Sequence, residues 1–518
     1  MVALPTTLAA AAALLGALAV PGLATAADEI HWTITGQKSV TLTWRGGGPE
    51  ALRYGTHPSV LNQVSAAAGC LPAPSSSPGP FWEARLTGLR EDTRYYYRIG
   101  NQSTHTFRTP PPRGEADYWF AEEADVGSTL TWANVGITQA MIPLDYPNLP
   151  GDDRPRFVLV PGDLTYGDQE TLADVGRHFN DVMAWSQDAA YMPAWGNHEW
   201  GTTADRNADN LNNYEGRFDL PNSKTSPGAS AAVGNGPDDD WYWFDYGNVR
   251  FIAFPEPYTG AWSDWSVKVD PVMQEAQNDP ELKFIVTFGH RPSWSSGADH
   301  GGDATLAGYM AALHATHSKY KLSLQAHSHH YERADPAQTG GILFIVGAGG
   351  GSTLGGLSST RPSWSAFRYD HLEHLRLHVQ DDRIDGYAIC GPLIAGNHDV
   401  CVQGTVIDSF SVLADPAVGV DLPPPPGPRL KLSAEPNPAL GSVAMVVEAD
   451  AAGEQSLTVL DLSGRRVRHL GTGWRAGGVR RVLWDGKDDS GALAPPGVYQ
   501  VSLRTGSRSV EARVALLR

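Results

Sequence analysis

The sequence predicts a multidomain protein with an N-terminal β-sandwich, a central α/β domain built as a β-sandwich flanked by helices, and a C-terminal β-sandwich. Three observations support this fold class. The two end regions alternate apolar and polar residues with period two, which is typical of strands. The middle region alternates short apolar runs with segments of helical spacing, and proline-rich segments separate the three regions. A chain of 518 residues is long enough for three to four domains.

The composition excludes two broad classes of protein. Hydrophobic residues make up 41% of the chain and charged residues 19%, so there is enough apolar material for large cores and disorder is excluded as the main state. The net charge of −18 argues against a general nucleic-acid binder, which needs a basic face, and we expect no nucleic-acid-binding module. The charge is uneven, because the chain from Arg429 onward carries +4 and the rest carries −22.

Residues 1–26 predict an export signal. The run from Leu8 to Val20 is apolar but too short to span a bilayer, and the small residues Ala24 and Ala26 follow it as a cleavage pattern. The signal departs from the usual form because no Lys or Arg precedes the apolar run, and a buried N-terminal helix is the alternative. No later run is long enough for a transmembrane segment, so we expect a secreted or cell-surface protein of bacterial export.

Residues 27–110 predict the first sandwich. The segments Ser39–Trp44 and Tyr95–Ile99 alternate with period two. The stretch Leu86–Arg98 resembles the corner before a late strand of a fibronectin type III domain. The prolines at 110–112 then mark the boundary.

Residues 114–414 form the predicted central domain. Its buried strands are expected at Phe157–Val160, Val249–Phe254, Phe284–Phe288 and Ile342–Val346. Helices are expected within Leu172–Trp185 and Ala304–Ser318. The segment containing His371, His374 and His378 is expected to be a strand with exposed histidines.

A proline-rich linker at 415–429 precedes the last sandwich, residues 430–518. This domain resembles the immunoglobulin-like hook-cap and sorting domains of bacterial exported proteins, which implies a role in sorting or surface attachment. The acidic segment Asp485–Gly491 is compatible with a calcium loop or a hairpin turn. The turn is favoured because Lys487 stands where a calcium ligand is needed.

Three cysteines are too few for a disulfide scaffold. Cys390 and Cys401 are close enough in sequence to close a short loop by a disulfide if the compartment is oxidising. Cys70 would then be left over. Both the bridged and the free state stay open at this point.

Five clusters of possible metal ligands lie in the central region, and four of them directly follow a strand-like run. The clusters contain Asp125, then Asp163 with Tyr166, then Asn197 with His198, then His290, and finally His327 with His329. Ligands gather at the carboxyl ends of strands in open α/β sheets, so we expect one common site. Carboxylate, amide, phenolate and imidazole groups suit a pair of intermediate-to-hard ions. Such a pair neutralises a phosphoryl group and supplies hydroxide near neutral pH.

The order Asp, Gly-Asp-x-x-Tyr, Gly-Asn-His-Glu, His and His-x-His resembles the purple acid phosphatases within the calcineurin-like metallophosphoesterases. With the N-terminal module, the resemblance covers about three-quarters of the chain. It implies that the first metal is held by Asp125, Asp163, Tyr166 and His329. It implies that the second is held by Asp163 as the bridge, with Asn197, His290 and His327. Ala124 and Ala326 depart from the family pattern, which has glycine at both positions.

The resemblance also implies three residues around the substrate. His198 would meet the phosphate and protonate the leaving oxygen, Asp168 would orient His198, and His300 would bind the phosphate. Tyr166 would place a phenolate on ferric iron, which gives the family its colour. The implied cofactor is therefore two metal ions, iron plus zinc, manganese or a second iron.

The sequence as a whole predicts a secreted, bimetal-dependent phosphatase that hydrolyses phosphate monoesters through a metal-bound hydroxide. A phosphodiesterase or nucleotide hydrolase of the same fold is an alternative, favoured if the segment Trp200–Trp241 forms an open groove. A surface adhesion or scaffold protein with a vestigial metal site is the other alternative. A second Gly-Asn-His motif ends at His398, and we interpret it as a chance loop because it follows all the other motifs.

Overall fold

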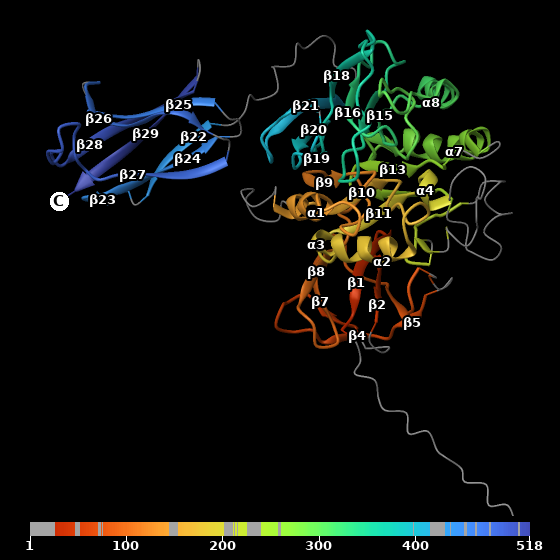
Figure 1. Ribbon diagram of the computed structural model, residues 1–518. Helices are drawn as coiled ribbons and strands as arrows, with labels where there is room; N and C mark the ends of the chain where they lie inside the picture. Colours follow the sequence, from red (N-terminus) through yellow and green to blue (C-terminus); the bar gives the residue numbers. More distant parts are fainter. Residues whose placement is uncertain are drawn as a thin grey trace, which may run out of the picture.

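The computed structural model describes residues 26–46, 52–70, 74, 76–144, 154–200, 211, 213–214, 216–224, 240–256, 261–396, 398–414, 430–435, 437–449, 453–461, 464–475, 478–505 and 508–517. The proposed export signal, most of the segment between Trp200 and Trp241, and the linker at 415–429 lie outside these residues. Within these ranges the strands form six sheets in three pairs (Figure 1). No helix within the described ranges is long and apolar enough to cross a membrane.

The N-terminal sandwich consists of two four-stranded sheets with the orders β1-β2-β6-β5 and β4-β3-β7-β8. Their strands are β1 (Asp28–Gly36), β2 (Ser39–Arg45), β3 (Leu52–Gly55), β4 (Gln63–Ser65), β5 (Ala68–Gly69), β6 (Phe81–Leu86), β7 (Arg94–Ile99) and β8 (His105–Arg108). Along β7 the side chains of Tyr95, Tyr97 and Ile99 are buried and those between them are not, as the period-two alternation predicts.

The central domain contains a six-stranded sheet of order β11-β10-β9-β19-β20-β21 and a seven-stranded sheet of order β12-β13-β14-β15-β17-β16-β18. The strands are β9 (Tyr118–Glu122), β10 (Phe157–Pro161), β11 (Ala190–Ala194), β12 (Trp243–Tyr246), β13 (Val249–Ala253), β14 (Phe284–Phe288), β15 (Tyr320–Gln325), β16 (Tyr331–Ala334), β17 (Leu343–Gly347), β18 (Ser365–Tyr369), β19 (Glu373–Val379), β20 (Arg383–Cys390) and β21 (Val406–Leu413). In one sheet β9, β10 and β11 are parallel, and in the other β13, β14, β15 and β17 are parallel.

Helices cover the outer faces of this sandwich. They are α1 (Val135–Leu144), α2 (Leu172–Asp181), α3 (Met183–Ser186), α7 (Ala261–Asn278) and α8 (Ala304–Thr316). The short helix α4 (Asn197–Trp200) instead follows the end of β11. Trp265 of α7 and Met310 of α8 pack in one apolar cluster with Ile285 of β14, so these two helices cover the seven-stranded sheet (Figure 1). The result is the predicted β-sandwich flanked by helices, and every apolar run expected to form a buried strand does so.

The strand β19 differs from the expectation of exposed histidines. His371, just before β19, and His374 within it are both about 1% exposed. The physical reason is the position of β19, which lies inside its sheet between β9 and β20, while helices and the second sheet cover its faces. His378 stacks on Trp119 with the ring centroids 4.3 Å apart.

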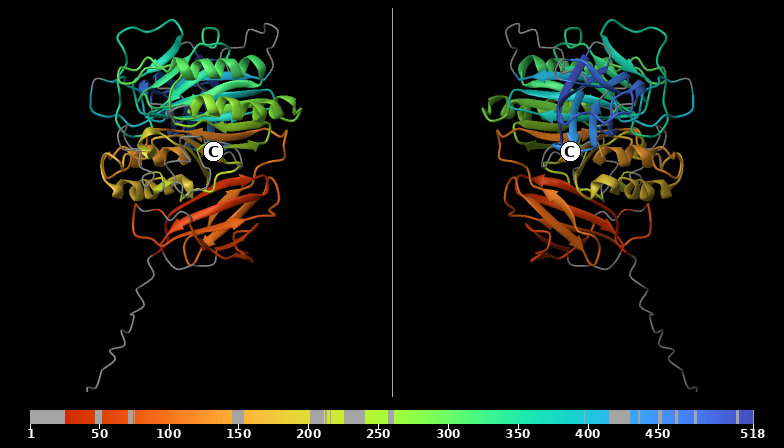
Figure 2. Two further views of the ribbon diagram at one scale, coloured as in Figure 1. Left: turned by 90° about the vertical axis from the view of Figure 1, so that its right-hand side faces the viewer. Right: turned by 90° about the vertical axis from the view of Figure 1, so that its left-hand side faces the viewer.

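The N-terminal sandwich packs directly against the central domain (Figure 2). Glu29 of β1 and Arg217 of the central domain form a fully buried ion pair. The Arg45 Nε atom lies 2.9 Å from the other oxygen of the Glu29 carboxylate. Arg217 also donates to Ser76 Oγ at 2.8 Å, and its guanidinium lies over the ring of Phe179. The Glu29–Arg217 pair is therefore shielded from water inside this interface, while Arg45 stays partly exposed at its edge.

Cys390 and Cys401 are joined by a disulfide, with their Cα atoms 6.1 Å apart, and Cys70 is a buried free cysteine. The bridge closes the loop that contains the second Gly-Asn-His motif. Within this loop His398 Nδ1 lies 2.8 Å from Asp370 Oδ2, a residue outside the predicted ligand set. Asn397 of the motif lies outside the described residues.

The C-terminal domain consists of a three-stranded sheet, β22-β24-β27, and a five-stranded sheet, β23-β29-β28-β25-β26. Its strands are β22 (Leu430–Glu435), β23 (Ala439–Leu440), β24 (Val443–Ala449), β25 (Gly453–Leu460), β26 (Arg466–Arg475), β27 (Gly478–Trp484), β28 (Gly497–Thr505) and β29 (Arg508–Leu517). After β27, the Asp488 carboxylate accepts the backbone N–H groups of Ser490 and Ala492, each at 2.9 Å. These bonds stabilise a turn, in line with the hairpin hypothesis.

Candidate metal centre

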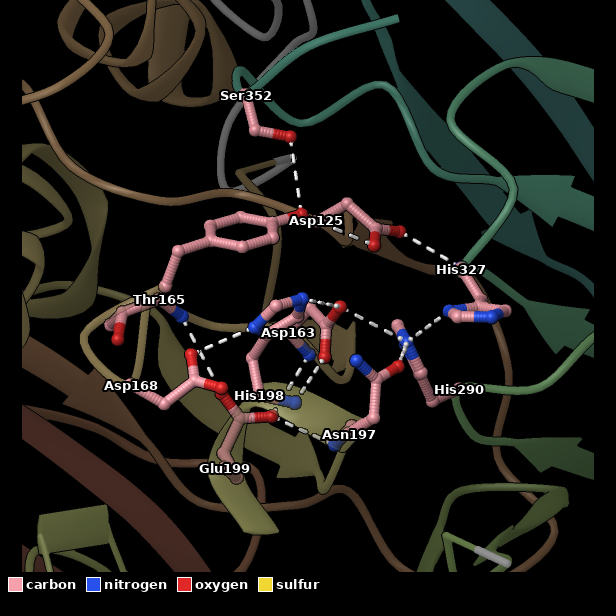
Figure 3. Close-up of polar contacts among 12 residues, drawn as sticks. Asp125, Asp163, Thr165, Asp168, Asn197, His198, Glu199, His290, His327 and Ser352 are labelled. Carbon is pink, nitrogen blue, oxygen red and sulfur yellow. Dashed lines mark hydrogen bonds and ion pairs between the residues drawn. The ribbon is translucent and has the colours of Figure 1, made fainter. Parts of the chain in front are cut away.

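The five ligand clusters follow the carboxyl ends of parallel strands. Asp125 follows β9, Asp163 follows β10, and Asn197 follows β11 in the six-stranded sheet. His290 follows β14 and His327 follows β15 in the seven-stranded sheet. Because the two sheets pack face to face, their strand ends bring these side chains into one region (Figure 3).

Three of these residues have a left-handed backbone. The φ angles are 54° at Asp125, 47° at Asp163 and 70° at His327. Such conformations cost an ordinary side chain about 1–3 kcal/mol and persist where the surroundings enforce them. Next to Asp163, a Cβ atom on Gly196 would lie 2.1 Å from Asp163 Oδ1, so only glycine fits at that position. The backbone is thus bent to direct the ligands, at a cost in strain.

Glu199 holds this strained turn, and sequence reasoning gave it no role. Its carboxylate is fully buried and accepts the backbone N–H groups of Asp163 and Leu164 at 2.9 Å and of Gly196 at 2.7 Å. It therefore ties the β10 loop to the β11 loop. The glutamate in the Gly-Asn-His-Glu motif was the available signal, but its partners depend on which loops meet in space.

Asp125, Tyr166 and His329 bring three donor atoms together. The Tyr166 hydroxyl lies 3.4 Å from Asp125 Oδ1 and 3.1 Å from His329 Nε2. Asp125 Oδ1 and His329 Nε2 are themselves 3.1 Å apart. On the other side, His329 Nδ1 lies 2.9 Å from the carbonyl oxygen of Thr353, which leaves Nε2 free to serve as a ligand.

Asp163, Asn197, His290 and His327 form a second set around His290 Nε2. This atom lies 3.2 Å from Asp163 Oδ2, 3.1 Å from Asn197 Oδ1 and 3.0 Å from His327 Nδ1. The other nitrogen of His290, Nδ1, lies 3.1 Å from the carbonyl oxygen of Pro161. The His327 backbone N–H donates to Asp125 Oδ2 at 3.0 Å, which connects the two sets.

Both sets fit a metal ion. Donor atoms about 2.1 Å from one ion lie about 3.0–3.4 Å from each other when they occupy adjacent positions. The three distances within the first set and the three from His290 Nε2 in the second set fall in this interval. The oxygen and nitrogen donors are those that iron, zinc and manganese accept. The contact with His290 places Asp163 in the second set. That its carboxylate also binds the first metal, and so bridges the two ions, stays a prediction.

The charges at the centre also favour cations. Burial opposes ionisation of Asp163, but the imidazoles of His290 and His198 outweigh it and hold the pKa of this carboxyl below its usual range. Burial, and then the carboxylates of Asp125 and Asp163, raise the pKa of Tyr166 well above its usual value. The phenol therefore keeps its proton unless a cation lies beside it.

His198 and Asp168 form a pair beside the second set. His198 Nδ1 lies 2.7 Å from Asp168 Oδ1, and His198 Nε2 lies 3.7 Å from Asp163 Oδ2. Burial alone would lower the pKa of His198, but Asp163 and then Asp168 outweigh it and raise the pKa to about 9. A protonated imidazole with its ring fixed by a carboxylate can donate a proton to a leaving oxygen.

His300 lies at the exposed side of the centre. Its ring stacks on that of His327, with centroids 3.9 Å apart and planes inclined by 22°. Its backbone carbonyl accepts a hydrogen bond from Ser328 Oγ at 2.9 Å, which fixes this loop beside the ligand pair.

Ser352 and Arg291 also reach the centre, and the sequence patterns did not identify them. Ser352 Oγ lies 3.2 Å from the Tyr166 hydroxyl. Arg291 contacts His327 on the edge opposite the donor set. Ser352 belongs to a loop whose position follows from the packing of the two sheets, so no local pattern marks it. Arg291 directly follows the predicted ligand His290, but the pattern gave it no role.

The two departures from the family pattern share one small apolar cluster. Ala124 and Ala326 are fully buried and pack with Val346 and Ala348. Their methyl groups therefore pack in one cluster, directly before Asp125 and His327 in the chain.

Comparisons with known proteins agree with this geometry. Residues 27–109 match the family model "Purple acid Phosphatase, N-terminal domain", residues 137–331 match "Calcineurin-like phosphoesterase" and residues 435–509 match "FlgD Ig-like domain". Purple acid phosphatase 18 of Arabidopsis thaliana is 24% identical over 383 residues, which cover 68% of this chain and 78% of the relative. Acid phosphatase type 7 of Homo sapiens is 25% identical over 416 residues, covering 70% and 87%.

A solved structure shares the fold. The purple acid phosphatase PPD1 from yellow lupin (Lupinus luteus) seeds covers 74% of both chains with a TM-score of 0.58 and 17% identity. The chain therefore contains a calcineurin-like metallophosphoesterase domain behind a purple acid phosphatase N-terminal domain. Its homologues are purple acid phosphatases, and together these findings support a metal-dependent phosphoric ester hydrolase.

Proposed function

We propose that this protein is an exported phosphatase that hydrolyses phosphate monoesters at a two-metal centre. The observation that supports it best is the pair of donor sets, each with atoms about 3 Å apart, next to the His198–Asp168 pair. The proposed ligands are those predicted from the sequence: Asp125, Asp163, Tyr166, Asn197, His290, His327 and His329. The proposed ions are iron together with zinc, manganese or a second iron.

The chain's own residues have distinct parts in this proposal. When bound, the two ions neutralise the phosphoryl oxygens and supply the attacking hydroxide. His198 protonates the leaving alcohol oxygen, and Asp168 holds the imidazole so that Nε2 faces the substrate. His300 contacts the phosphate from the exposed side, where its ring lies against His327.

The proposed domain boundaries are those of the sequence analysis. They are 1–26 for the export signal, 27–110 and 114–414 for the first two domains, 415–429 for the linker and 430–518 for the immunoglobulin-like domain. We assign sorting or surface attachment to this last domain, whose positive charge sets it apart from the acidic remainder. The disulfide between Cys390 and Cys401 favours an oxidising compartment.

The test combines metal analysis with a substrate panel. Elemental analysis of natively produced protein should find close to two equivalents of metal, at least one of them iron. Turnover of p-nitrophenyl phosphate should exceed that of bis-p-nitrophenyl phosphate. A preference for the diester would move the protein to the phosphodiesterase alternative. Protein without bound metal and without activity would support the scaffold alternative, and metal-free active protein would overturn the proposed mechanism.

A further inference from the structure

The exposed loop that carries His300 decides where its ring lies. Ser296 and Gly301 close this loop through an isolated β-bridge, and residues 298–301 are exposed. Within the described ranges the His300 ring forms no hydrogen bond, and it contacts the centre by stacking on His327 with the ring centroids 3.9 Å apart. The contacts that fasten the loop backbone therefore control the position of the ring.

A buried carboxylate holds the base of this loop. Glu332 of β16 is 1% exposed, and it accepts the backbone N–H and the hydroxyl of Ser296, each at 2.6 Å. The same carboxylate lies 3.2 Å from His330 Nε2. Glu332 therefore joins the start of the loop to the ring of His330.

The other nitrogen of this ring lies beside the residue that holds the tip of the loop. His330 Nδ1 is 3.1 Å from Ser328 Oγ, and both side chains are fully buried. Ser328 Oγ lies 2.9 Å from the carbonyl oxygen of His300 and 3.2 Å from Asp299 Oδ1. Ser295 Oγ reaches the same carbonyl oxygen at 2.9 Å and is a second contact at the tip. His330 thus connects the groups that hold both ends of the loop.

The loop packs directly on these side chains at Gly297. A Cβ atom at this position would collide with Ser328 Oγ and would lie 3.0 Å from His330 Cε1. Removing the imidazole would also take one partner from the buried Glu332 carboxylate and one from the Ser328 hydroxyl. Buried polar groups that lose a partner favour a rearrangement that restores it. A change at His330 is therefore transmitted to the loop.

We propose that His330 is a positioning residue for phosphate binding, because it holds the loop in the place from which the His300 ring reaches the phosphoryl group. This inference rests on the proposed phosphatase function and assigns a role to a residue outside the predicted site set. The two ring nitrogens of His330 face Ser328 and Glu332. It therefore acts through the loop and not by contact with the substrate.

Calorimetric titration of the metal-loaded protein with inorganic phosphate tests the proposal without turnover. His300→Ala should weaken phosphate binding by about 10-fold, since a hydrogen bond to a charged group is lost. His330→Ala should weaken it by about 5-fold, because the His300 ring is then held less firmly. The double variant should bind phosphate within about 2-fold of His300→Ala alone, because His330 acts only through that ring. Metal content should stay near wild type in all three variants.

Gly297→Ala disturbs the same contact from the side of the loop, and it decides the question if His330→Ala does not fold. It should also weaken phosphate binding by about 5-fold and should add nothing to His300→Ala. His317→Ala is the matched control. His317 is another buried histidine with a carboxylate partner, Asp270 at 2.8 Å, and it lies before β15, whereas His330 lies after it. The control should leave phosphate affinity unchanged.

The outcomes separate this inference from the proposed function. Unchanged phosphate affinity in His330→Ala, Gly297→Ala or His300→Ala would overturn the inference, and so would losses that multiply in the double variant. Loss of metal from His330→Ala would also overturn it, because the residue would then support the ligands and not the loop. After any of these results, a wild type that holds metal and hydrolyses p-nitrophenyl phosphate leaves the proposed function intact. A wild type without metal or phosphatase activity would defeat the proposed function, and this inference with it.

Discussion

His198 and His398 follow identical Gly-Asn sequences, yet their environments differ. His198 is buried beside Asp163 and Asp168. His398 lies in the disulfide loop, and its Nδ1 contacts Asp370, which lies outside that loop. We expect His198→Ala to lower turnover by about 10²–10⁴, because a general acid is lost, with metal content close to wild type. His398→Ala should leave turnover within a few-fold. Steady-state kinetics with elemental analysis measures both variants.

Equal losses from these two variants would contradict this assignment, as would a loss from His398→Ala alone. Either result would require the metal ligands to be assigned again, because Asn197 and His198 were chosen together from one motif.

Tyr166 provides a spectroscopic test of the first donor set. Its hydroxyl lies 3.1 Å from His329 Nε2 and 3.4 Å from Asp125 Oδ1. If it binds ferric iron, the wild type should absorb visible light and Tyr166→Phe should lose this band while keeping its fold by circular dichroism. A colourless wild type with two zinc or manganese ions would refute the iron assignment. Tyr331→Phe, which removes a hydroxyl bonded to Asp408, is the matched control and should keep the band.

At the scale of residues, the order of the motifs predicted which ligand side chains come together. It did not predict the residues that hold those ligands in place. Asp125, Tyr166 and His329 were named from motifs far apart in the chain, and the structure brings them together. Glu199 and Ser352 were not given roles. Their partners are set by the packing of one loop on another, which leaves no periodic pattern in the sequence.

At the scale of elements, two neighbouring strands carry buried carboxyls beneath the centre. Glu122 of β9 and Glu373 of β19 are both fully buried. Burial, and then the charges of Glu123 and Asp125, raise the pKa of Glu373 to about 8, although the Gly349 N–H bonded to its carboxylate opposes the rise. Burial and then Glu373 raise the pKa of Glu122 well above its usual value. Burial therefore favours the protonated form of both glutamates in the folded state, and Glu373 holds its proton up to about pH 8.

This arrangement predicts how stability depends on pH. The unfolded chain releases the Glu373 proton above about pH 4.5 and the folded chain releases it only near pH 8, so stability falls as pH rises across this window. Glu373→Gln mimics the protonated carboxyl. It should raise the free energy of unfolding by about 2–4 kcal/mol at pH 8 and change it little at pH 4.5. Urea unfolding at both pH values measures this.

The control is Glu281→Gln, since Glu281 is exposed on the surface. The Glu281→Gln variant should change the free energy of unfolding only slightly, and by the same amount at both pH values. A Glu373→Gln variant that is destabilised at pH 8 would mean that the native carboxyl is ionised there and that a cation or water compensates it.

The elements themselves were largely predictable. The apolar runs that became β10, β13, β14 and β17 are short and bounded by turn residues, and such runs are typical of strands buried on both faces. The burial of His371 and His374 was not predictable. It depends on β19 lying between β9 and β20, which is a property of strand order and not of local sequence.

At the scale of the whole molecule, the buried Glu29–Arg217 pair couples the N-terminal sandwich to the central domain. We expect Arg217→Met to destabilise the protein by about 3 kcal/mol, because it leaves the Glu29 carboxylate buried with Arg45 as its remaining cation. The double variant Glu29→Gln with Arg217→Met should recover most of this loss, since no unpaired charge remains. Urea unfolding monitored by tryptophan fluorescence compares the variants.

The same interface predicts that these two domains unfold in a single transition. If Arg217→Met and the double variant are equally destabilised, packing on Phe179 and not the ion pair holds the interface. If the N-terminal sandwich unfolds first in the wild type, the coupling itself is refuted.

The left-handed backbone at Asp125, Asp163 and His327 has a consequence for protein engineering. A designer who transplants this centre onto another pair of sheets must copy three unfavourable main-chain bends as well as the side chains. Copying the side chains alone onto relaxed loops would point the carboxylates and the imidazole elsewhere. The transferable unit is therefore the loop with its supports, Glu199 and Gly196 included, and grafts that omit them should fail to assemble a centre even when every ligand is present.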